Sequence, residues 1–317
     1  MIVTLTANPS VDRTLEIPAL ERGEVVRATA ARVHPGGKGV NVARALIANG
    51  ISARAVLPTG GREGDQLLDL LSSRGVDVVP VQIAEPIREN VTIVEPDGTV
   101  TKLNAPGPRL TWPEVTALVD ATVEASRAAD WVALCGALPP GAPEDLYGSL
   151  VKELHAIGVR VAVDASGAAL TESIAAGPDL IKPNAEELAE AVDTPIRTLR
   201  DVVEGARGLL ERGVGHVLVS LGEKGAVSVT DAVVTRAWTT PVVPRSTVGA
   251  GDATLAGFLA ADGVAAEAVR AAVAWGAAAV RLPGTEMPGK ADIDLADVKV
   301  EQLDSEGSAF GDGRGKG

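Results

Sequence analysis

The chain is poor in the residues that build disulfide-bonded, metal-binding and aromatic-rich proteins. It has one cysteine, three histidines and only 2% aromatic residues in a length of 317. A single cysteine excludes an internal disulfide and is typical of a reducing compartment. Cys135 stands in an apolar run, so we interpret it as a buried structural thiol. The histidines His34, His155 and His216 do not show the spacing of metal ligands.

Basic residues are also in deficit. The 29 Lys and Arg are outnumbered by 42 Asp and Glu, so the net charge is −13. This excess of negative charge argues against nucleic acid as a partner, although it permits an anionic small substrate where cations cluster locally. The Ala-rich run between Arg270 and Arg281 is shorter than the roughly 20 residues that span a bilayer. The N-terminus lacks the basic start of a secretory signal. We therefore expect a cytoplasmic protein that binds neither nucleic acid nor a membrane.

What the chain has in quantity is apolar sequence in regular alternation. Hydrophobic residues make up 46% of the chain, enough for a large core. Continuous apolar runs typical of parallel strands buried on both faces lie at 131–135, 159–163 and 216–221. Helical spacing predicts helices over 113–127, 144–157, 185–192 and 199–212. The pattern predicts an α/β fold with a mainly parallel sheet between helices, as one domain over residues 1–300 with a flexible tail over 301–317.

Two segments interrupt this alternation. Residues 14–33 alternate weakly, as short strands do, and residues 87–94 and 99–103 read as a hairpin around a Pro-Asp-Gly turn. We expect these segments, at about 12–33 and 86–104, to form a small sheet outside the main body, a lid with Arg88 as its exposed cation.

Polar or glycine-rich turns follow several of the predicted strands. They lie at 136–141, 164–166, 182–184 and 220–225. Ligands of open α/β sheets bind beyond the carboxyl ends of the strands, so these turns should line a site. Asp12 follows the first predicted strand, over residues 1–7, and belongs to the same group. The alternative for Asp12 is an ordinary turn residue beside Pro and Ser.

The stretch over residues 246–252 opens a late apolar helix. Gly249, Ala250 and Gly251 expose the N–H groups of a helix N-terminus, which attract phosphate oxygens. Asp252 should repel an anion there. Its predicted role is therefore to take a proton from a hydroxyl that attacks a phosphoryl group. The alternative is that Asp252 only caps the helix.

A second glycine-rich turn precedes an earlier helix, with Gly36, Gly37, Lys38 and Asn41 in it. It is not a P-loop, whose spacing occurs nowhere in the chain. Asn184 and a glutamate three residues later, Glu187, share one face at the start of the helix predicted over 185–192. Their oxygens could hold a hydrated Mg²⁺, or they could cap the helix.

In order and approximate separation, these segments resemble the signature segments of the ribokinase-like (PfkB) sugar kinases. Residues 36–43 and 247–252 resemble the two signatures, residues 182–187 the magnesium-associated motif and residues 220–225 the nucleotide loop. The resemblance covers about residues 1–290. It implies a ribokinase-like three-layer α/β/α core with a small β-sheet lid.

Within that family the chain is most similar to the phosphosugar kinases, 1-phosphofructokinase and tagatose-6-phosphate kinase. The similarity lies in residues 6–12, 88–91, 103–108 and 136–141. It implies ATP- and Mg²⁺-dependent phosphorylation of a ketohexose monophosphate, foremost D-fructose 1-phosphate to D-fructose 1,6-bisphosphate. Alternatives are tagatose-6-phosphate kinase and 6-phosphofructokinase.

Two readings from other classes stay open at this point. A catalytically silent sugar-phosphate-binding protein would have no need of Asp252 beside the glycines. A dinucleotide-binding turn at Gly249 and Gly251 would need a third glycine where Thr254 stands.

The resemblance also implies a role for individual residues. Catalysis would use Asp252 with the N–H groups of Gly249, Ala250 and Gly251. The phosphosugar would contact Asp12, Gly36, Gly37, Lys38, Asn41, Arg88, Arg27 and Asn104. ATP would contact Lys182, Asn184, Ser220, Gly222, Gly225, Val273 and Ala277. Mg²⁺ would be organised by Glu187 and Asn184. The resemblance further implies a homodimer formed through the lid sheet.

Overall fold

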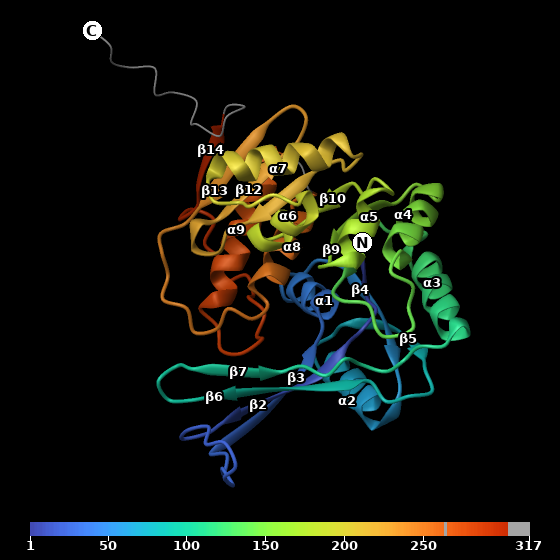
Figure 1. Ribbon diagram of the computed structural model, residues 1–317, viewed down its shortest axis with the longest axis vertical. Coiled ribbons are helices and arrows are strands. Elements are labelled where there is room, and N and C mark those ends of the chain that lie inside the picture. The colour runs from blue at the N-terminus through green and yellow to red at the C-terminus, as the bar shows by residue number, and fades with distance from the viewer. Residues whose placement is uncertain (263–264, 304–317) are drawn as a thin grey trace.

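The computed structural model describes residues 1–262 and 265–303, and its main body is a large twisted sheet (Figure 1). The strands of this sheet are β1 Ile2–Thr6, β4 Ala53–Thr59, β5 Asp77–Gln82, β8 Trp131–Cys135, β9 Arg160–Asp164, β10 Leu180–Ile181, β11 Val217–Ser220, β12 Ala226–Val229, β13 Val234–Trp238 and β14 Lys299–Leu303. Their spatial order is β14-β13-β12-β11-β10-β9-β8-β1-β4-β5. The pairs from β5 to β11 are parallel, and those from β11 to β14 are antiparallel. The predicted mainly parallel sheet is confirmed.

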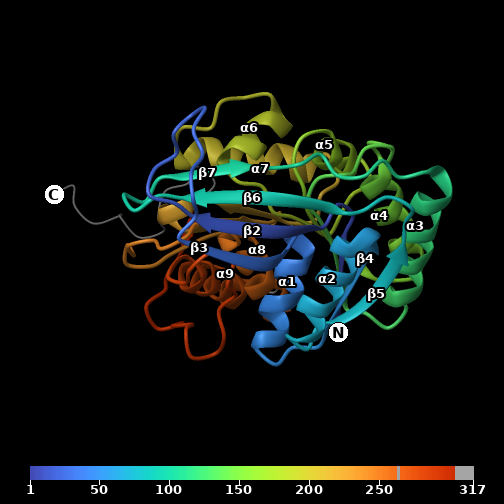
Figure 2. The ribbon, with the colours of Figure 1, turned by 90° about the horizontal axis from the view of Figure 1, so that it is seen from below.

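Helices cover both faces of the sheet (Figure 2). One face carries α1 Lys38–Ala48, α2 Gly61–Ser72, α8 Ala250–Ala260 and α9 Ala265–Val280. The other carries α3 Trp112–Ser126, α4 Leu146–Ala156, α5 Ala168–Ile174, α6 Ala185–Val192 and α7 Leu199–Glu211. This arrangement is the expected three-layer α/β/α core. No helix in the described part of the chain combines the length and apolar character needed to cross a bilayer.

Local sequence explains where these elements start. The central strands β1 and β8 are buried at every residue, as strands covered on both faces are; β8 is apolar throughout, and β1 has two threonines among its apolar residues. Capping boxes begin α3, α6 and α7, in which the side chains of the N-cap residue and of the third helical residue bond each other's backbone. The helices predicted over 113–127, 144–157, 185–192 and 199–212 accordingly end within two residues of the observed bounds.

The predicted lid is present as a second sheet, which lies below the main body in Figure 1. Its strands are β2 Ser10–Glu16, β3 Ala30–Gly36, β6 Arg88–Val94 and β7 Val100–Leu103, in the order β3-β2-β6-β7. The hairpin expected around residues 96–98 connects β6 and β7. Asp12 lies inside β2 and not in a turn at the end of β1, because the chain enters the lid directly after Pro9.

Several elements have no counterpart in the sequence analysis, namely α5, β12, β13 and β14. Residues 301–303 were assigned to a flexible tail, and they form the end of β14. This strand pairs with β13 over residues 299–303 and 234–238, and Leu303 is buried against the core. Its partner is about sixty residues away, so local composition did not reveal it. The rest of the predicted tail, 304–317, lies outside the described residues.

Candidate active site

A cavity of about 1650 Å³ lies between the lid and the carboxyl edge of the main sheet. Its walls come from the lid strands, from the first turns of α1, α6 and α8, from the loop after β11, and from α9. Most of the residues singled out in the sequence line it. They are Asp12, Gly37, Lys38, Asn41, Arg88, Asn104, Lys182, Asn184, Glu187, Ser220, Gly222, Gly225, Gly249, Ala250, Gly251, Asp252, Val273 and Ala277.

Two of the predicted residues do not line this cavity. Gly36 is buried behind the lid surface, where a Cβ atom would come within 2.5 Å of Asp12 Cγ. Its absence of a side chain lets the ends of β2 and β3 approach each other. Arg27 is exposed in the connection between β2 and β3, outside the cavity lining. The structure therefore does not bring Gly36 and Arg27 into the cavity with the other predicted residues.

The first turn of α8 presents unpaired backbone donors to the cavity. Gly249 is the N-cap at φ 80°, a conformation that favours glycine, and the first helical hydrogen bond runs from Ala253 N to Gly249 O. The N–H groups before Ala253 therefore have no acceptor within the helix. A Cβ atom on Gly251 would lie 3.4 Å from Lys182 Nζ, so a lysine stands close to this turn. Amide donors and an ammonium group together favour an anion here.

Asp252 lies in this turn but does not cap the helix. Its side chain is 7% exposed, and Oδ2 accepts a hydrogen bond of 2.8 Å from Asn41 Nδ2 on α1. No side-chain cap hydrogen bond is present at the start of α8. The capping alternative is thus not what the structure shows.

A buried ion cluster lies beside Asp252. Asp164, at the end of β9, is fully buried and receives Lys38 Nζ at 2.7 Å and Lys182 Nζ at 3.1 Å. Lys38 Nζ also lies 3.8 Å from Glu187 Oε1. The partners of Lys38 are therefore neighbours of the residues that the family resemblance assigns to ATP. The resemblance assigns Lys38 to the phosphosugar, and its ammonium group lies among these residues.

The pKa values of the two buried aspartates, Asp252 and Asp164, are shifted in opposite directions. Burial, together with the negative charge of Asp164, raises the pKa of Asp252 to about 6, although Asn41 and the lysines act in the other direction. Burial would also raise the pKa of Asp164, but Lys182 and Lys38 outweigh it and hold that pKa below its usual value. Neighbouring carboxyls whose pKa values are pushed apart are a common arrangement for acid–base catalysis. Asp252 has the pKa of a base that works near neutral pH, and Asp164 stays ionised.

Lid side chains form the opposite wall of the cavity. Asp12 Oδ1 accepts hydrogen bonds from Ser10 Oγ at 2.7 Å and from Asn90 Nδ2 at 3.0 Å. Arg88 donates from Nη1 to the Ala105 carbonyl at 2.8 Å and from Nη2 to the Asn8 carbonyl at 3.0 Å. Its Nε is buried and has no partner among the described residues. A hydroxyl-binding carboxylate and a guanidinium group thus face the cavity from the lid.

The loop after β11 and the face of α9 form the remaining wall. Gly222 begins the short 3₁₀ helix η1 Gly222–Lys224, and Gly225 has a φ of 87°. A Cβ atom on Gly225 would collide with the Ala237 carbonyl, so the loop can be this tight only with glycine. Val273 and Ala277 add an apolar surface from α9. A tight loop beside an apolar surface suits a phosphate chain that ends in a flat ring.

Asn184 and Glu187 are a capping box, the alternative left open by the sequence. The Asn184 amide oxygen accepts from Glu186 N and Glu187 N, and Glu187 Oε2 accepts from Asn184 N. The Asn184 oxygen is therefore occupied by the helix, whereas Glu187 Oε1 is turned toward Lys38. Among residues 1–262 and 265–303, no group of three or more His, Cys, Asp or Glu side chains is arranged to hold a metal ion.

Three residues that contact predicted site residues received no role in the sequence analysis. Asp164 was included in a turn after a buried strand but received no role, and Asn90 was quoted in a motif without one. Arg44 is buried on α1, and its Nη1 donates to Asn41 Oδ1 at 3.0 Å. The available signal was an arginine within a largely apolar helix, three residues after Asn41 and so on the same face.

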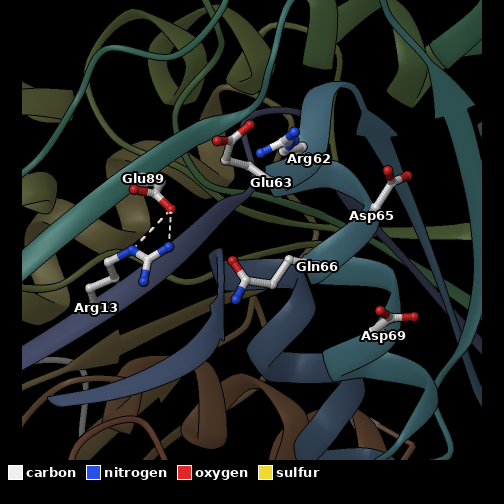
Figure 3. A pocket seen from close by; sticks show the side chains of 7 residues that line it. All are labelled: Arg13, Arg62, Glu63, Asp65, Gln66, Asp69 and Glu89. Carbon is white, nitrogen blue, oxygen red and sulfur yellow. Dashed lines mark hydrogen bonds and ion pairs between the residues drawn. The ribbon is translucent and has the colours of Figure 1, made fainter.

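A smaller groove of about 450 Å³ lies behind the lid, between β2, β6 and α2 (Figure 3). Arg13 donates from Nε and Nη2 to Glu89 Oε1 across it, at 3.0 and 2.7 Å. The acidic side chains of Glu63, Asp65 and Asp69 line the α2 side. None of the residues singled out in the sequence lies in this groove.

Known proteins similar to this chain in sequence and in structure are phosphofructokinases. The chain is 36% identical to 1-phosphofructokinase of Rhodobacter capsulatus over 90% of its length and 92% of the relative. It is 35% identical to ATP-dependent 6-phosphofructokinase isozyme 2 of Escherichia coli, over 90% and 94%. The crystal structure of Escherichia coli phosphofructokinase-2 with potassium superposes with a TM-score of 0.87, at 34% identity and covering 92% and 96% of the two chains. That enzyme is also known in a tetrameric inhibited form. The family profile of the pfkB carbohydrate kinases matches residues 5–291, so the chain belongs to the pfkB family of carbohydrate kinases.

Proposed function

We propose that the chain transfers the γ-phosphoryl group of ATP to a ketohexose monophosphate, D-fructose 1-phosphate, and forms D-fructose 1,6-bisphosphate and ADP. The observation that carries this proposal is the buried carboxylate of Asp252, which lies at the amide donors of α8 in one cavity with Lys38 and Arg88. The relative from Rhodobacter capsulatus supports fructose 1-phosphate as the substrate. The Escherichia coli relative makes fructose 6-phosphate the second candidate.

In the proposed reaction Asp252 accepts the proton of the sugar hydroxyl while the hydroxyl oxygen bonds to the γ-phosphorus. The bond between that phosphorus and the bridging oxygen breaks, and ADP leaves with the electron pair. Negative charge spreads over the equatorial oxygens of the transferred group. The N–H groups of Gly249, Ala250 and Gly251 would stabilise this charge, as preorganised donors do.

The basic side chains of the cavity fall into two groups, one for the ATP phosphates and one for the phosphate of the sugar. Lys38 and Lys182 lie at the α8 end, where ATP phosphates would approach, and the ionised Asp164 keeps both lysines oriented. Arg88 belongs to the lid wall with Asp12, so we assign it to the phosphate already on the sugar. A guanidinium group suits that role because its fork binds phosphate through two parallel hydrogen bonds.

Mg²⁺ fits this donor set through Glu187. Such sites commonly use one or two carboxylates, with water and substrate phosphates as the other ligands. Glu187 Oε1 is free of the helix cap, and the Asn184 oxygen is not. The ion would offset charge on the ATP phosphates.

The proposal is tested by assaying the purified protein with ATP and each of D-fructose 1-phosphate, D-fructose 6-phosphate and D-tagatose 6-phosphate. We expect the highest kcat/KM with fructose 1-phosphate. A preference for fructose 6-phosphate would select the second candidate. Absence of transfer to all three would refute the proposal and favour a silent sugar-phosphate-binding protein.

Replacing Arg88 by Ala should raise the KM for the phosphosugar about 10–100-fold, because hydrogen bonds to a charged group are worth roughly 1.5–3 kcal/mol. The kcat should change far less, since the phosphate that Arg88 holds does not react. The matched control is Arg13→Ala, which removes an arginine of the same sheet that faces the groove of Figure 3. An unchanged KM in the Arg88 variant would place the phosphate elsewhere.

The pH dependence of kcat/KM should show an acid limb set by Asp252. The base must be unprotonated, and its pKa is raised to about 6 by burial. Activity should therefore be full above about pH 7 and fall about tenfold for each pH unit below 6. Steady-state rates between about pH 4 and pH 8 measure this, and a limb near pH 4 would mean that the pKa of the base is not raised.

We also propose that the lid sheet pairs two copies of the chain. Strand β7 is an edge strand, and its apolar side chains Val100 and Leu103 are 49% and 57% exposed. Such an edge is a template for pairing with another chain. Sedimentation should report a dimer for the native chain and a monomer for the Leu103→Asp variant, and a monomeric native chain would contradict the proposal.

A further inference from the structure

Arg44 is a buried arginine of α1 that does not itself line the cavity. It is 6% exposed, and its Nε has no hydrogen-bond partner among the described residues. Its Nη1 donates to Asn41 Oδ1 at 3.0 Å, and Asn41 Nδ2 donates to Asp252 Oδ2 at 2.8 Å. A buried cation is thus connected to the reacting carboxylate through one amide.

We propose that Arg44 is a positioning residue that fixes the direction of the Asn41 amide and thereby keeps Oδ2 of Asp252 unprotonated. The inference rests on the proposed role of Asp252 as the base. It assigns a function to a side chain that does not itself line the cavity.

The direction follows from which atoms can donate. A guanidinium group has donors only, so the Asn41 atom that faces Arg44 must be the amide oxygen. The NH₂ group of Asn41 then faces Asp252 and can only donate. A proton on Oδ2 would put two donors opposite each other, which prevents the hydrogen bond. Oδ2 therefore has to be unprotonated and accept from Asn41. The proton taken from the substrate hydroxyl is thereby directed to Oδ1.

Without Arg44 the Asn41 amide could turn by half a rotation. Its oxygen would then face Asp252 and accept a proton from it, which stabilises the protonated carboxyl. Loss of the nearby positive charge acts in the same sense, because a cation favours the ionised carboxylate. Both changes raise the pKa of Asp252.

The other charged groups around the pair do not replace Arg44. The groups that face Asp252 are Lys38 from α1, Asp164 from β9 and Lys182 from the turn after β10. Arg44 faces Arg74 after α2, Glu286 after α9, Asp12 on β2 and Asp252 itself. Burial lowers the pKa of the neighbouring His34 on β3, which favours the neutral ring at neutral pH. The structure shows a hydrogen bond to the Asn41 oxygen from Arg44 and from no other group in the described residues.

The test is a carboxyl titration of the ligand-free protein by ¹³C NMR with labelled aspartate. The Asp252 signal is assigned by its loss in Asp252→Asn. In the native protein it should titrate at about 6. In Arg44→Met it should titrate about one pH unit higher, and in Arg44→Lys, which keeps a donor and the charge, it should stay within about 0.3 of native. In an Asn41→Leu background the Arg44→Met shift should largely disappear.

Kinetics give a second readout that a merely structural role would not produce. The kcat/KM of Arg44→Met should fall about 5–10-fold near pH 6 and less than about twofold near pH 8.5, because only the acid limb moves. A loss of equal size at both pH values would mean that Arg44 supports the fold and not the base.

Two results would overturn the inference. One is an unshifted Asp252 titration in folded Arg44→Met, and the other is an equal shift in the Asn41→Leu background. If Arg44→Met does not fold, Arg44→Gln takes its place, because a glutamine amide can either donate or accept and so no longer fixes Asn41. The NMR titration needs no substrate, so it can be carried out even if the native chain phosphorylates no fructose phosphate. Such a chain would refute the proposed function, but it would leave the titration result and the role of Arg44 to be judged separately.

Discussion

Replacing Asp252 by Asn is expected to lower kcat about 10²–10⁴-fold, the usual contribution of a general base. The amide keeps the size of the carboxyl and can still accept from Asn41 Nδ2, so the geometry of the α8 turn should persist. It cannot take a proton from the acceptor hydroxyl. The KM for ATP should stay within about threefold of native, because the donors of Gly249 and Ala250 are unchanged. The measurement is steady-state kinetics with fructose 1-phosphate, with ATP affinity checked by calorimetry.

The same substitution should stabilise the fold above neutral pH. Asp252 has a folded pKa of about 6, which is above its unfolded value, so its buried charge destabilises the native state once it ionises. The cost is absent below about pH 4 and complete above about pH 7, where it amounts to roughly 1–3 kcal/mol. Urea unfolding at both ends of that range measures it. Removing a reactive but unfavourable charge is expected to gain stability and lose activity together.

Asp120→Asn is the matched control for this experiment, because Asp120 is exposed on α3, outside the cavity. It should leave both kcat and stability within error of native. Near-normal turnover of the Asp252 variant would remove the base role, and with it the central claim of the proposed mechanism.

Replacing Asp164 by Leu is expected to destabilise the protein by about 3–5 kcal/mol at neutral pH, the usual effect of removing one partner of a buried ion pair. The carboxylate is fully buried, and Lys182, one of its two partners, is 4% exposed. Both lysines would lose their counter-ion. The folded pKa of Asp164 is depressed, so its contribution is present above about pH 4 and disappears as the pH falls below its folded pKa. Urea unfolding near pH 7 and near pH 3 should show the difference shrinking.

Two further variants separate this effect from general damage. Adding Lys182→Met to Asp164→Leu removes one uncompensated charge and should recover part of the lost stability. Asp130→Asn removes a surface carboxylate whose side chain is 67% exposed in its ion pair with the N-terminus, and it should cost less than about 1 kcal/mol. A native-like midpoint for Asp164→Leu would show that the lysines find other partners.

The parts of this protein that could be predicted from its sequence are those determined by residues close together in the chain. The glycines before Lys38 and before Asp252, and the apolar strands that end in polar turns, identify two helix N-termini and one edge of a sheet. The residues of the cavity that follow those glycines and strand ends come from these local signals, whereas the lining at 239–245 and 283–286 was not identified. The hairpin of the lid was equally visible, because its turn and both of its strands are contiguous.

The missed residues depend on contacts between distant parts of the chain. Asp164 acquires its role only when Lys38, 126 positions earlier, is folded onto it. The contact of Asn41 with Asp252 joins residues 211 positions apart, and Arg44 has no visible purpose until that contact exists. Arg27 was predicted from its position in a motif, yet it does not line the cavity. It lies in the exposed connection between β2 and β3, whose course the motif does not determine.

The last strand of the sheet has a practical consequence. Because β14 covers the outer side of β13, the backbone groups of Val234 and of the four residues after it are paired with another strand and not presented to solvent. A chain shortened to end before Lys299 would leave β13 as an open, largely apolar border, the kind of border through which β-proteins aggregate. Truncation for crystallisation should therefore stop after Leu303, and affinity tags belong beyond that residue.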